Sequence, residues 1–145
     1  MKAKLMNCVK PLTQTNCVSW ALLLLRFVAG LAFIFHGWGK IQTPFGWMPE
    51  GAPVPGFLQG LAALAEFGGG IAWLLGLLTP LASLGLAITM AVATAMHMFV
   101  MKDPFVNMTG GSSYELAAVY FSIAILFMAV GPGKFSADYK IFGQR

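Results

Sequence analysis

The chain alternates between long apolar stretches and short polar connections, and this pattern predicts its architecture. Four apolar stretches stand out, over residues 18–38, 57–78, 80–101 and 114–130. Each approaches the roughly 20 residues that an α-helix needs to cross the hydrocarbon core of a bilayer. Because a helix pairs its own backbone groups within lipid at this length, the pattern predicts an all-α protein, a four-helix transmembrane bundle.

Composition supports an integral membrane protein. Of the 145 residues, 58% are hydrophobic and 10% are charged, and the mean hydropathy is +0.76. A soluble domain carries about 25% charged residues. The basic residues form no face interleaved with aromatic residues, so we expect no nucleic-acid partner. The first apolar stretch is too long for a signal peptide and lacks its small-residue cleavage motif.

The distribution of lysine and arginine predicts the orientation in the membrane. Basic residues precede the first stretch and follow the last one: Lys2, Lys4, Lys10, Lys134, Lys140 and Arg145. The positive-inside rule therefore predicts that both termini are cytoplasmic, and four spans require both on one side. We divide the chain into a cytoplasmic extension (1–17), a membrane domain (18–138) and a cytoplasmic tail (139–145).

The connections between the stretches are unequal. The connection formed by residues 42–56 is long and proline-rich, and we expect it to cover the outer end of the bundle. The second and third stretches meet in a tight hairpin, where Thr79 can cap the following helix and Pro80 suits its first turn. Gly68, Gly69 and Gly70, together with Gly76, are expected to let a neighbouring backbone approach closely.

Ionisable residues inside apolar stretches are costly, so each is a candidate functional residue. They are Arg26, His36, Glu66, His97 and Glu115. Counted from the cytoplasmic end of each helix, Arg26 is about 12 Å deep, Glu66 about 18 Å, and the other three about 24–27 Å. We therefore predict a buried Arg26–Glu66 ion pair below an outer layer of two histidines and a glutamate.

Each candidate also has a purely structural interpretation. The Arg26–Glu66 pair can simply hold two helices together. Ser112 and Glu115 match an S-x-x-E capping box, so Glu115 can cap the last helix. His36 can be satisfied by interfacial water, and His97 can bond one turn back near Thr94. A two-histidine, one-carboxylate metal site would need Glu115, and we predict no metal.

The two cysteines, Cys8 and Cys17, precede the first apolar stretch. Their spacing matches neither a CxxC motif nor a zinc site. We interpret them as reduced, inert thiols.

Several motifs together resemble one family. They are Leu25-Arg26-x3-Gly30-x2-Phe33-x2-His36-Gly37-x2-Lys40, then Glu66-Phe67-Gly68-Gly69-Gly70, then Gly76-Leu77-Leu78-Thr79-Pro80-Leu81-Ala82, and finally Gly131-Pro132-Gly133 with Ser136 and Asp138. This combination resembles the signatures of the DoxX family from about residue 20 to residue 138. The resemblance implies a small, multi-pass protein of the bacterial inner (plasma) membrane with four helices. Some members resemble the membrane subunit of a thiosulfate:quinone oxidoreductase, and others are associated with quinone or thiol stress.

The resemblance implies that Arg26, His36, Glu66 and His97 are the residues nearest any chemistry. In the leading hypothesis the protein is a quinone-interacting, redox-associated subunit, and His36 or His97 contacts the quinone. Glu66 then relays a proton while Arg26 keeps it ionised. The sequence leaves open whether the protein is an enzyme.

Electrons must come from elsewhere, because the chain has no CxxC motif, no flavin or nicotinamide fingerprint and no evident haem ligands. We expect no covalent cofactor and a soluble redox partner protein. Two alternatives stay open: a non-catalytic scaffold that recruits such a partner through its basic termini, and a small transporter. Self-association as a homo-oligomer is also compatible with the glycine-rich faces.

Overall fold

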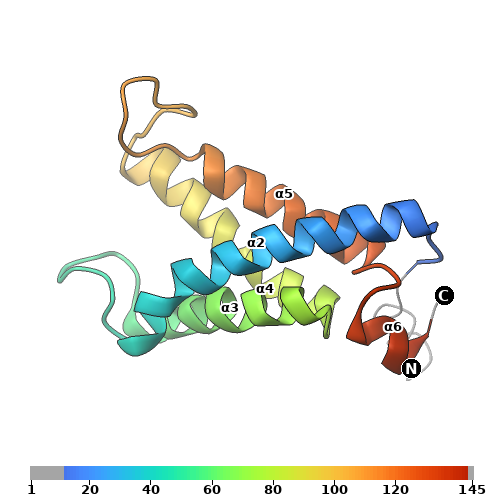
Figure 1. The fold of residues 1–145 in the computed structure, drawn as a ribbon. Helices are drawn as coiled ribbons and strands as arrows, with labels where there is room; N and C mark the ends of the chain where they lie inside the picture. The colour runs from blue at the N-terminus through green and yellow to red at the C-terminus, as the bar shows by residue number, and fades with distance from the viewer. Residues whose placement is uncertain (1–11, 144–145) are drawn as a thin grey trace.

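The computed structural model describes residues 12–143, and over this range it is entirely helical (Figure 1). The elements are α2 (Asn16–Gln42), α3 (Gly56–Leu75), α4 (Thr79–Ala95), the π-helical turn η1 (Met96–Val100), α5 (Glu115–Val130) and α6 (Ala137–Phe142). Three helices, α2, α3 and the continuous α4–η1, are long and apolar enough to cross a membrane, and α5 is a shorter apolar helix. The all-α prediction is confirmed.

The helices form two antiparallel pairs, α2 with α3 and α4 with α5, and α3 packs against α4 to join them. Figure 1 shows the pairs diverging with distance from the connection between α3 and α4. We call the end with this connection, Gly76–Leu78, the hairpin end, and the opposite end the pocket end. The beginning of α2 and helix α6 both lie at the hairpin end (Figure 1).

Trp73 on α3 is the centre of the hydrophobic core. Its ring packs edge-to-face against Phe33 of α2 and Phe127 of α5, with centroid distances of 5.4 and 4.8 Å. Its indole N–H donates to the Ser83 hydroxyl of α4 at 2.9 Å. A buried tryptophan needs such an acceptor, so this one side chain ties all four long helices together.

Glycines allow α2 and α3 to pack closely, as predicted for the glycine run. A Cβ at Gly70 would lie 2.8 Å from the Gly30 carbonyl oxygen and 2.8 Å from the Ile34 nitrogen. Gly69 faces the other way, toward Leu86 of α4, whereas Gly68 meets only Leu64 of its own helix. Two of these glycines therefore set the spacing between helices.

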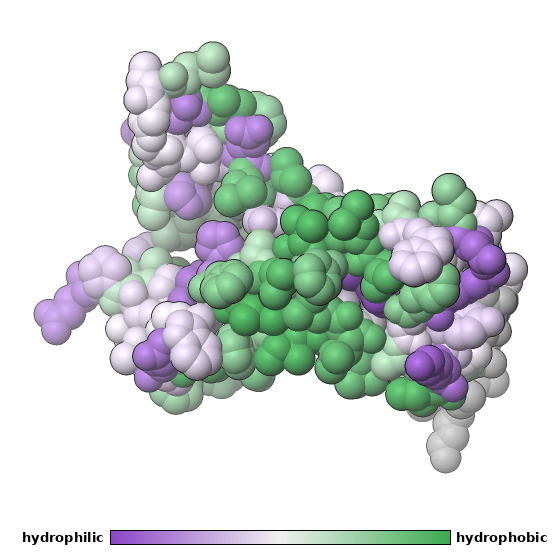
Figure 2. Space-filling view, in the orientation of Figure 1, coloured by the Kyte–Doolittle hydropathy of each residue, from purple (hydrophilic) through white to green (hydrophobic). Residues whose placement is uncertain are grey.

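The outer surface is apolar, as expected for contact with lipid. Large side chains such as Leu24, Phe35 and Ile88 are exposed. Figure 2 shows an apolar belt over the middle of the molecule, with hydrophilic residues toward both ends. Because a monomeric soluble protein rarely exposes so much continuous apolar surface, this belt marks the part of the molecule that lies in the bilayer.

The hairpin end differs from its predicted form. Thr79 is not the cap of α4; Leu78 precedes the helix, in the left-handed conformation with φ of 47°. The Asp138 carboxylate accepts hydrogen bonds from the Leu78 and Thr79 amides, at 2.6 and 2.8 Å. Pro80 lies in the first turn of α4, as predicted. The cap therefore comes from α6, a short helix that the sequence analysis did not predict.

The capping box expected at Ser112 and Glu115 is also wrong. Helix α5 begins at Glu115 itself, Tyr114 is the residue before it, and no side chain caps this end. Tyr114 and Glu115 instead donate their amides to the carbonyls of Pro104 and Phe105. Pairing with the preceding loop thus replaces the local cap.

Several predictions concern residues outside the described range. Cys8, Lys2, Lys4, Lys10 and Arg145 belong to this group. Cys17, which is described, is a free and exposed thiol.

Candidate functional site

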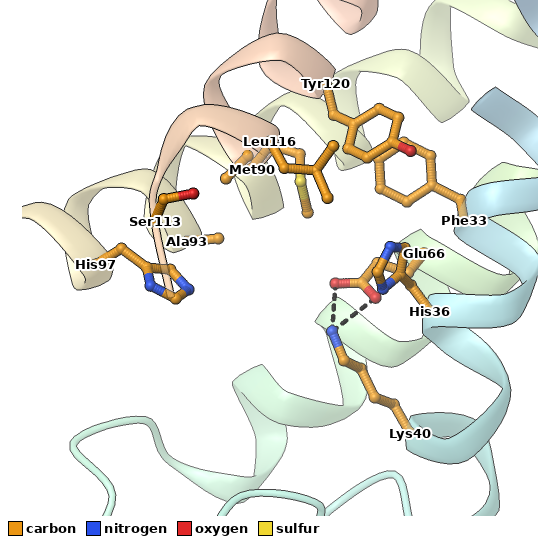
Figure 3. A pocket seen from close by; sticks show the side chains of 11 residues that line it. Phe33, His36, Lys40, Glu66, Met90, Ala93, His97, Ser113, Leu116 and Tyr120 are labelled. Carbon is orange, nitrogen blue, oxygen red and sulfur yellow. Dashed lines mark hydrogen bonds and ion pairs between the residues drawn. The ribbon is translucent and has the colours of Figure 1, made fainter. Parts of the chain in front are cut away.

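A pocket of about 180 Å³ lies at the pocket end, between the two helix pairs (Figure 3). Its α2–α3 wall carries an ion pair, and its α4–α5 wall carries a histidine and aromatic and aliphatic groups. The lining residues are Phe33, His36, Lys40, Glu66, Met90, Ala93, His97, Ser113, Leu116, Ala117 and Tyr120.

Helical periodicity explains why these residues meet. Phe33, His36 and Lys40 are separated by three and four positions on α2, so they share one face. Met90 and His97, with Ala93 between them, repeat this spacing along α4 and η1. Phe33 and Met90 also belong to the hydrophobic core. The bottom of the pocket is therefore continuous with the core.

Glu66 forms its ion pair with Lys40. Both carboxylate oxygens accept from the Lys40 ammonium at 2.7 Å, and the Glu66 side chain is 4% exposed against 25% for Lys40. The ammonium also lies 4.6 Å from the ring centre of Trp47, whose indole donates to the Gln59 carbonyl at 3.0 Å. Trp47 of the segment 43–55 therefore lies against the pair, while most of this segment is exposed and does not cover the end of the bundle.

His97 lies opposite this pair and has its own carboxylate partner. Its Nδ1 is 2.7 Å from an Asp103 carboxylate oxygen. Lys102, with φ of 58°, turns the chain back after η1, and the Asp103 amide donates to the His97 carbonyl at 2.9 Å. A histidine bound at Nδ1 keeps Nε2 for another partner. The predicted bond near Thr94 is wrong, since Thr94 donates to the Met90 carbonyl.

His36 and Tyr120 lie next to each other in the pocket, near Phe33. Their rings are 6.4 Å apart in an edge-to-face arrangement, and Tyr120 is 4.8 Å from the ring of Phe33. His36 and His97 therefore line one pocket from different helices (Figure 3). Glu115, the third member of the predicted layer, is exposed and outside the lining.

The predicted Arg26–Glu66 pair is wrong. Arg26 is 1% exposed at the hairpin end, where its Nη2 donates to the Phe135 carbonyl at 2.8 Å and where it lies within electrostatic range of Asp138. Lys40, the true partner of Glu66, is about 21 Å further along α2. The functional role suggested for Arg26 beside Glu66 therefore has no geometric support.

The depth estimate failed because it assumed that the helices begin at one level. Helix α2 extends past the connection between α3 and α4 (Figure 1). Arg26 consequently lies level with Gly76, where a Cβ would collide with Arg26 Nη1. Counting residues from the end of each helix cannot detect such an offset.

No group of three or more histidine, cysteine or acidic residues within 12–143 is arranged to hold a metal ion. His36, His97 and Glu66 line one pocket, but Glu66 is neutralised by Lys40 and His97 is bonded to Asp103. The pocket therefore combines one ion pair, Lys40–Glu66, with one histidine–carboxylate hydrogen bond, His97–Asp103.

Residues 21–100 match the family model described as DoxX. The chain belongs to the DoxX family. It is 32% identical over 119 residues to the inner membrane protein YqjF of Escherichia coli (strain K12), an alignment that covers 81% of this chain and 88% of that protein. No solved structure gives a significant match. With its apolar helices, this DoxX-family chain is a multi-pass protein of the inner membrane.

The DoxX match covers the walls formed by α2, α3 and α4, while the α5 wall lies beyond residue 100. Sequence reasoning did not single out four residues of the pocket and its surroundings as candidates: Lys40, Asp103, Ser113 and Tyr120. Lys40 was detectable, because it is four positions after His36 on the same helical face. Asp103 and Ser113 lie in a connection whose path only the fold defines.

Proposed function

We propose that this protein binds the head group of a quinone in the pocket and serves as the membrane subunit of a quinone-linked redox complex. The observation that carries the proposal is the pocket between the helix pairs, with Lys40–Glu66 on one wall and His97–Asp103 on the other. A quinone head group is a flat, uncharged ring with a carbonyl acceptor on each side. Hydrogen-bond donors on opposite walls suit such a ligand.

The size of the pocket suits the head group of a quinone without its long apolar substituent. Pockets for whole drug-sized ligands measure about 300–1,000 Å³, whereas this one measures about 180 Å³. A long apolar substituent must therefore remain outside, and the diverging helix pairs leave it a route into the lipid. Phe33, Leu116 and Tyr120 supply apolar contact for the ring.

The Lys40–Glu66 ion pair and the His97–Asp103 hydrogen bond can supply hydrogen bonds and protons. Lys40 offers a donor to one carbonyl while Glu66 balances its charge. On the opposite wall, Asp103 orients His97 so that Nε2 is free for the ligand. A histidine oriented by a carboxylate is suited to general acid–base chemistry. His36 and the Tyr120 hydroxyl are further donors.

Reduction of a quinone to a quinol takes two electrons and two protons. The residues of the pocket can deliver protons, but they carry no electrons. We therefore assign the electrons to a soluble redox protein that docks on the membrane subunit. Arg26 has no part in this scheme because it lies at the other end of α2.

The closed end of the pocket argues against the transporter hypothesis. Phe33, Trp73 and Phe127 pack edge-to-face below it and are almost fully buried. A transport path along the bundle axis would have to pass through this layer. The scaffold hypothesis does not explain the pocket, because recruiting a soluble partner requires no polar side chains around a cavity within the bundle.

Binding of a short-chain quinone to the purified protein in detergent tests the proposal. We expect saturable quenching of tryptophan fluorescence by decylubiquinone, and affinity at least tenfold weaker in His97→Ala, as for the loss of one charge-assisted hydrogen bond. Tyr120→Phe removes one hydroxyl and should weaken binding less.

Glu115→Gln is the matched control, because Glu115 lies on the same helix as Tyr120 but outside the pocket. It should bind quinone as the unaltered protein does. Absence of saturable binding in the unaltered protein, or equal weakening in Glu115→Gln and His97→Ala, would contradict the proposal.

A further inference from the structure

A second hollow, of about 480 Å³, lies at the hairpin end. It forms where α6 and the segment leading into it pass the end of α3. Two lysines and several apolar side chains share its lining, which comprises Leu75, Leu77, Lys134, Phe135, Ser136, Ala137 and Lys140. We call it the basic groove. It does not overlap the pocket of the proposed function.

The positive charge of the basic groove is not neutralised by the described part of the chain. No carboxylate among residues 12–143 forms an ion pair with Lys134 or Lys140. The Lys134 ammonium donates to the neutral side chain of Asn16 at 2.9 Å. The nearest acid in sequence, Asp138, is fully buried, and its two oxygens accept from the amides of Leu78 and Thr79. An anion can therefore pair with both lysines.

The surroundings of the basic groove match the interface between lipid and water. The exposed Trp20 packs against Phe135, with ring centres 4.5 Å apart. Leu75, beside the groove, and Ile141 on α6 are exposed apolar side chains. Tryptophan is enriched at the level of lipid head groups, and lysine extends its ammonium toward them. Hydrophilic residues gather beside apolar surface at this end (Figure 2).

We propose that the basic groove binds the head group of an anionic phospholipid. The phosphate pairs with Lys134 and Lys140, and the acyl chains follow Leu75 and Phe135 into the bilayer. Basic pockets at the ends of membrane helices recognise anionic lipids in this way. The apolar lining favours a lipid over a free anion, because a free phosphate would not cover the exposed apolar surface of Leu75 and Phe135.

Binding of a lipid here would also stabilise the fold. The groove is built partly from α6, and α6 supplies the Asp138 cap of α4. A lipid that holds α6 in place keeps this cap formed. Lipid binding is therefore measurable as thermal stabilisation of the whole protein, by mass action on the folded state.

The test compares lipids added to the delipidated, full-length protein in neutral detergent. We expect phosphatidylglycerol to raise the melting temperature and to remain bound in native mass spectrometry, whereas phosphatidylcholine does neither. The double variant Lys134→Gln/Lys140→Gln should bind phosphatidylglycerol about 10–30-fold more weakly, as for two lost lysine–phosphate contacts. Lys102→Gln, an exposed lysine at the pocket end, should bind as the unaltered protein does.

Two further variants separate lipid binding from folding. Lys140→Gln alone removes no side-chain hydrogen bond to any residue within 12–143, yet it should weaken binding severalfold. Lys134→Arg/Lys140→Arg keeps both charges and should retain it. Equal stabilisation by both lipids, or by inorganic phosphate as strongly as by phosphatidylglycerol, would overturn the proposal. So would a soluble protein that needs both lysines for binding in the absence of lipid.

Discussion

The hairpin end and the pocket end both hold charged side chains within the bundle, but in different ways. At the hairpin end, Arg26 and Asp138 are 1% and 0% exposed. Backbone groups of turns and helix ends are their hydrogen-bond partners: the Phe135 carbonyl for Arg26, and the first amides of α4 for Asp138. Both side chains are thereby fixed to the path of the chain itself.

At the pocket end, charged side chains pair with one another beside a cavity. The Lys40–Glu66 and His97–Asp103 pairs are held at 2.7 Å, and each keeps one partly exposed member. Such a member can turn toward a ligand without breaking a backbone hydrogen bond. A buried charge in a membrane protein is a stronger candidate for function when its partners leave it free to interact further. Arg26 is buried against the chain at the hairpin end, while His97 and Lys40 line a cavity.

Removing the carboxylate of Asp138 should have the largest effect on stability. Asp138→Ala takes away the cap of α4 and leaves Arg26 without its nearby negative charge, and breaking a buried charge arrangement costs about 3–5 kcal/mol. Asp103→Ala, at the pocket end, should cost about 1 kcal/mol or less because this pair is partly exposed. Thermal unfolding in detergent measures both. Equal losses would remove the distinction between the two ends.

A side chain at Gly76 should be the next most damaging change. Gly76→Ala places a methyl group against Arg26 Nη1 at a residue with φ of 62°, and such strain costs about 1–3 kcal/mol. Gly68→Ala on the same helix is the control. Its Cβ would meet only Leu64, at 3.6 Å, so the gain in helix propensity should leave stability unchanged or slightly higher. A lower melting temperature for Gly68→Ala than for Gly76→Ala would contradict this account of the hairpin end.

Replacing Lys40 should lower the stability of the protein more than replacing Glu66, its partner in the ion pair. Lys40→Met strands a carboxylate that is 4% exposed and should cost about 1–3 kcal/mol. Glu66→Gln should cost less, because the lysine can reach water. The double variant should recover part of the loss of Lys40→Met, and the coupling energy from the double-mutant cycle measures the pair. Strictly additive effects would show that the two residues do not depend on each other.

The smallest predicted difference in stability is between the alanine variants of two serines that lie near the beginnings of helices. Ser136 accepts from the Tyr139 amide and caps α6, so Ser136→Ala should cost about 1 kcal/mol. Ser112→Ala should change stability by less than about 0.5 kcal/mol, because α5 has no side-chain cap. Melting temperatures of the two variants suffice. A larger loss for Ser112→Ala would restore the capping box that the sequence pattern suggested.

Predictions from the sequence were reliable where the cause is local. Hydropathy over a stretch of residues reports contact with lipid, so the all-α fold and its apolar helices followed from the pattern. His36 and His97 do line one pocket, but the depth count that grouped them also included Glu115, which lies outside it. The close contact at Gly70 also followed, because the absence of a side chain acts through its immediate surroundings.

Which residue pairs with a given charged side chain, in contrast, depends on how far one helix is shifted and rotated against the next. Asp138 binds α4 across 59 positions of sequence, and Lys40 reaches Glu66 across 26. The shift of α2 past the hairpin placed Arg26 beside Gly76 and away from Glu66. Hydropathy and spacing by themselves determined that this protein is a helical membrane protein with ionisable residues in its bundle. Only the tertiary packing decided which charged side chains are bound to backbone groups and which line a cavity. The reason is that the shift of one helix along another arises from contacts between residues distant in sequence.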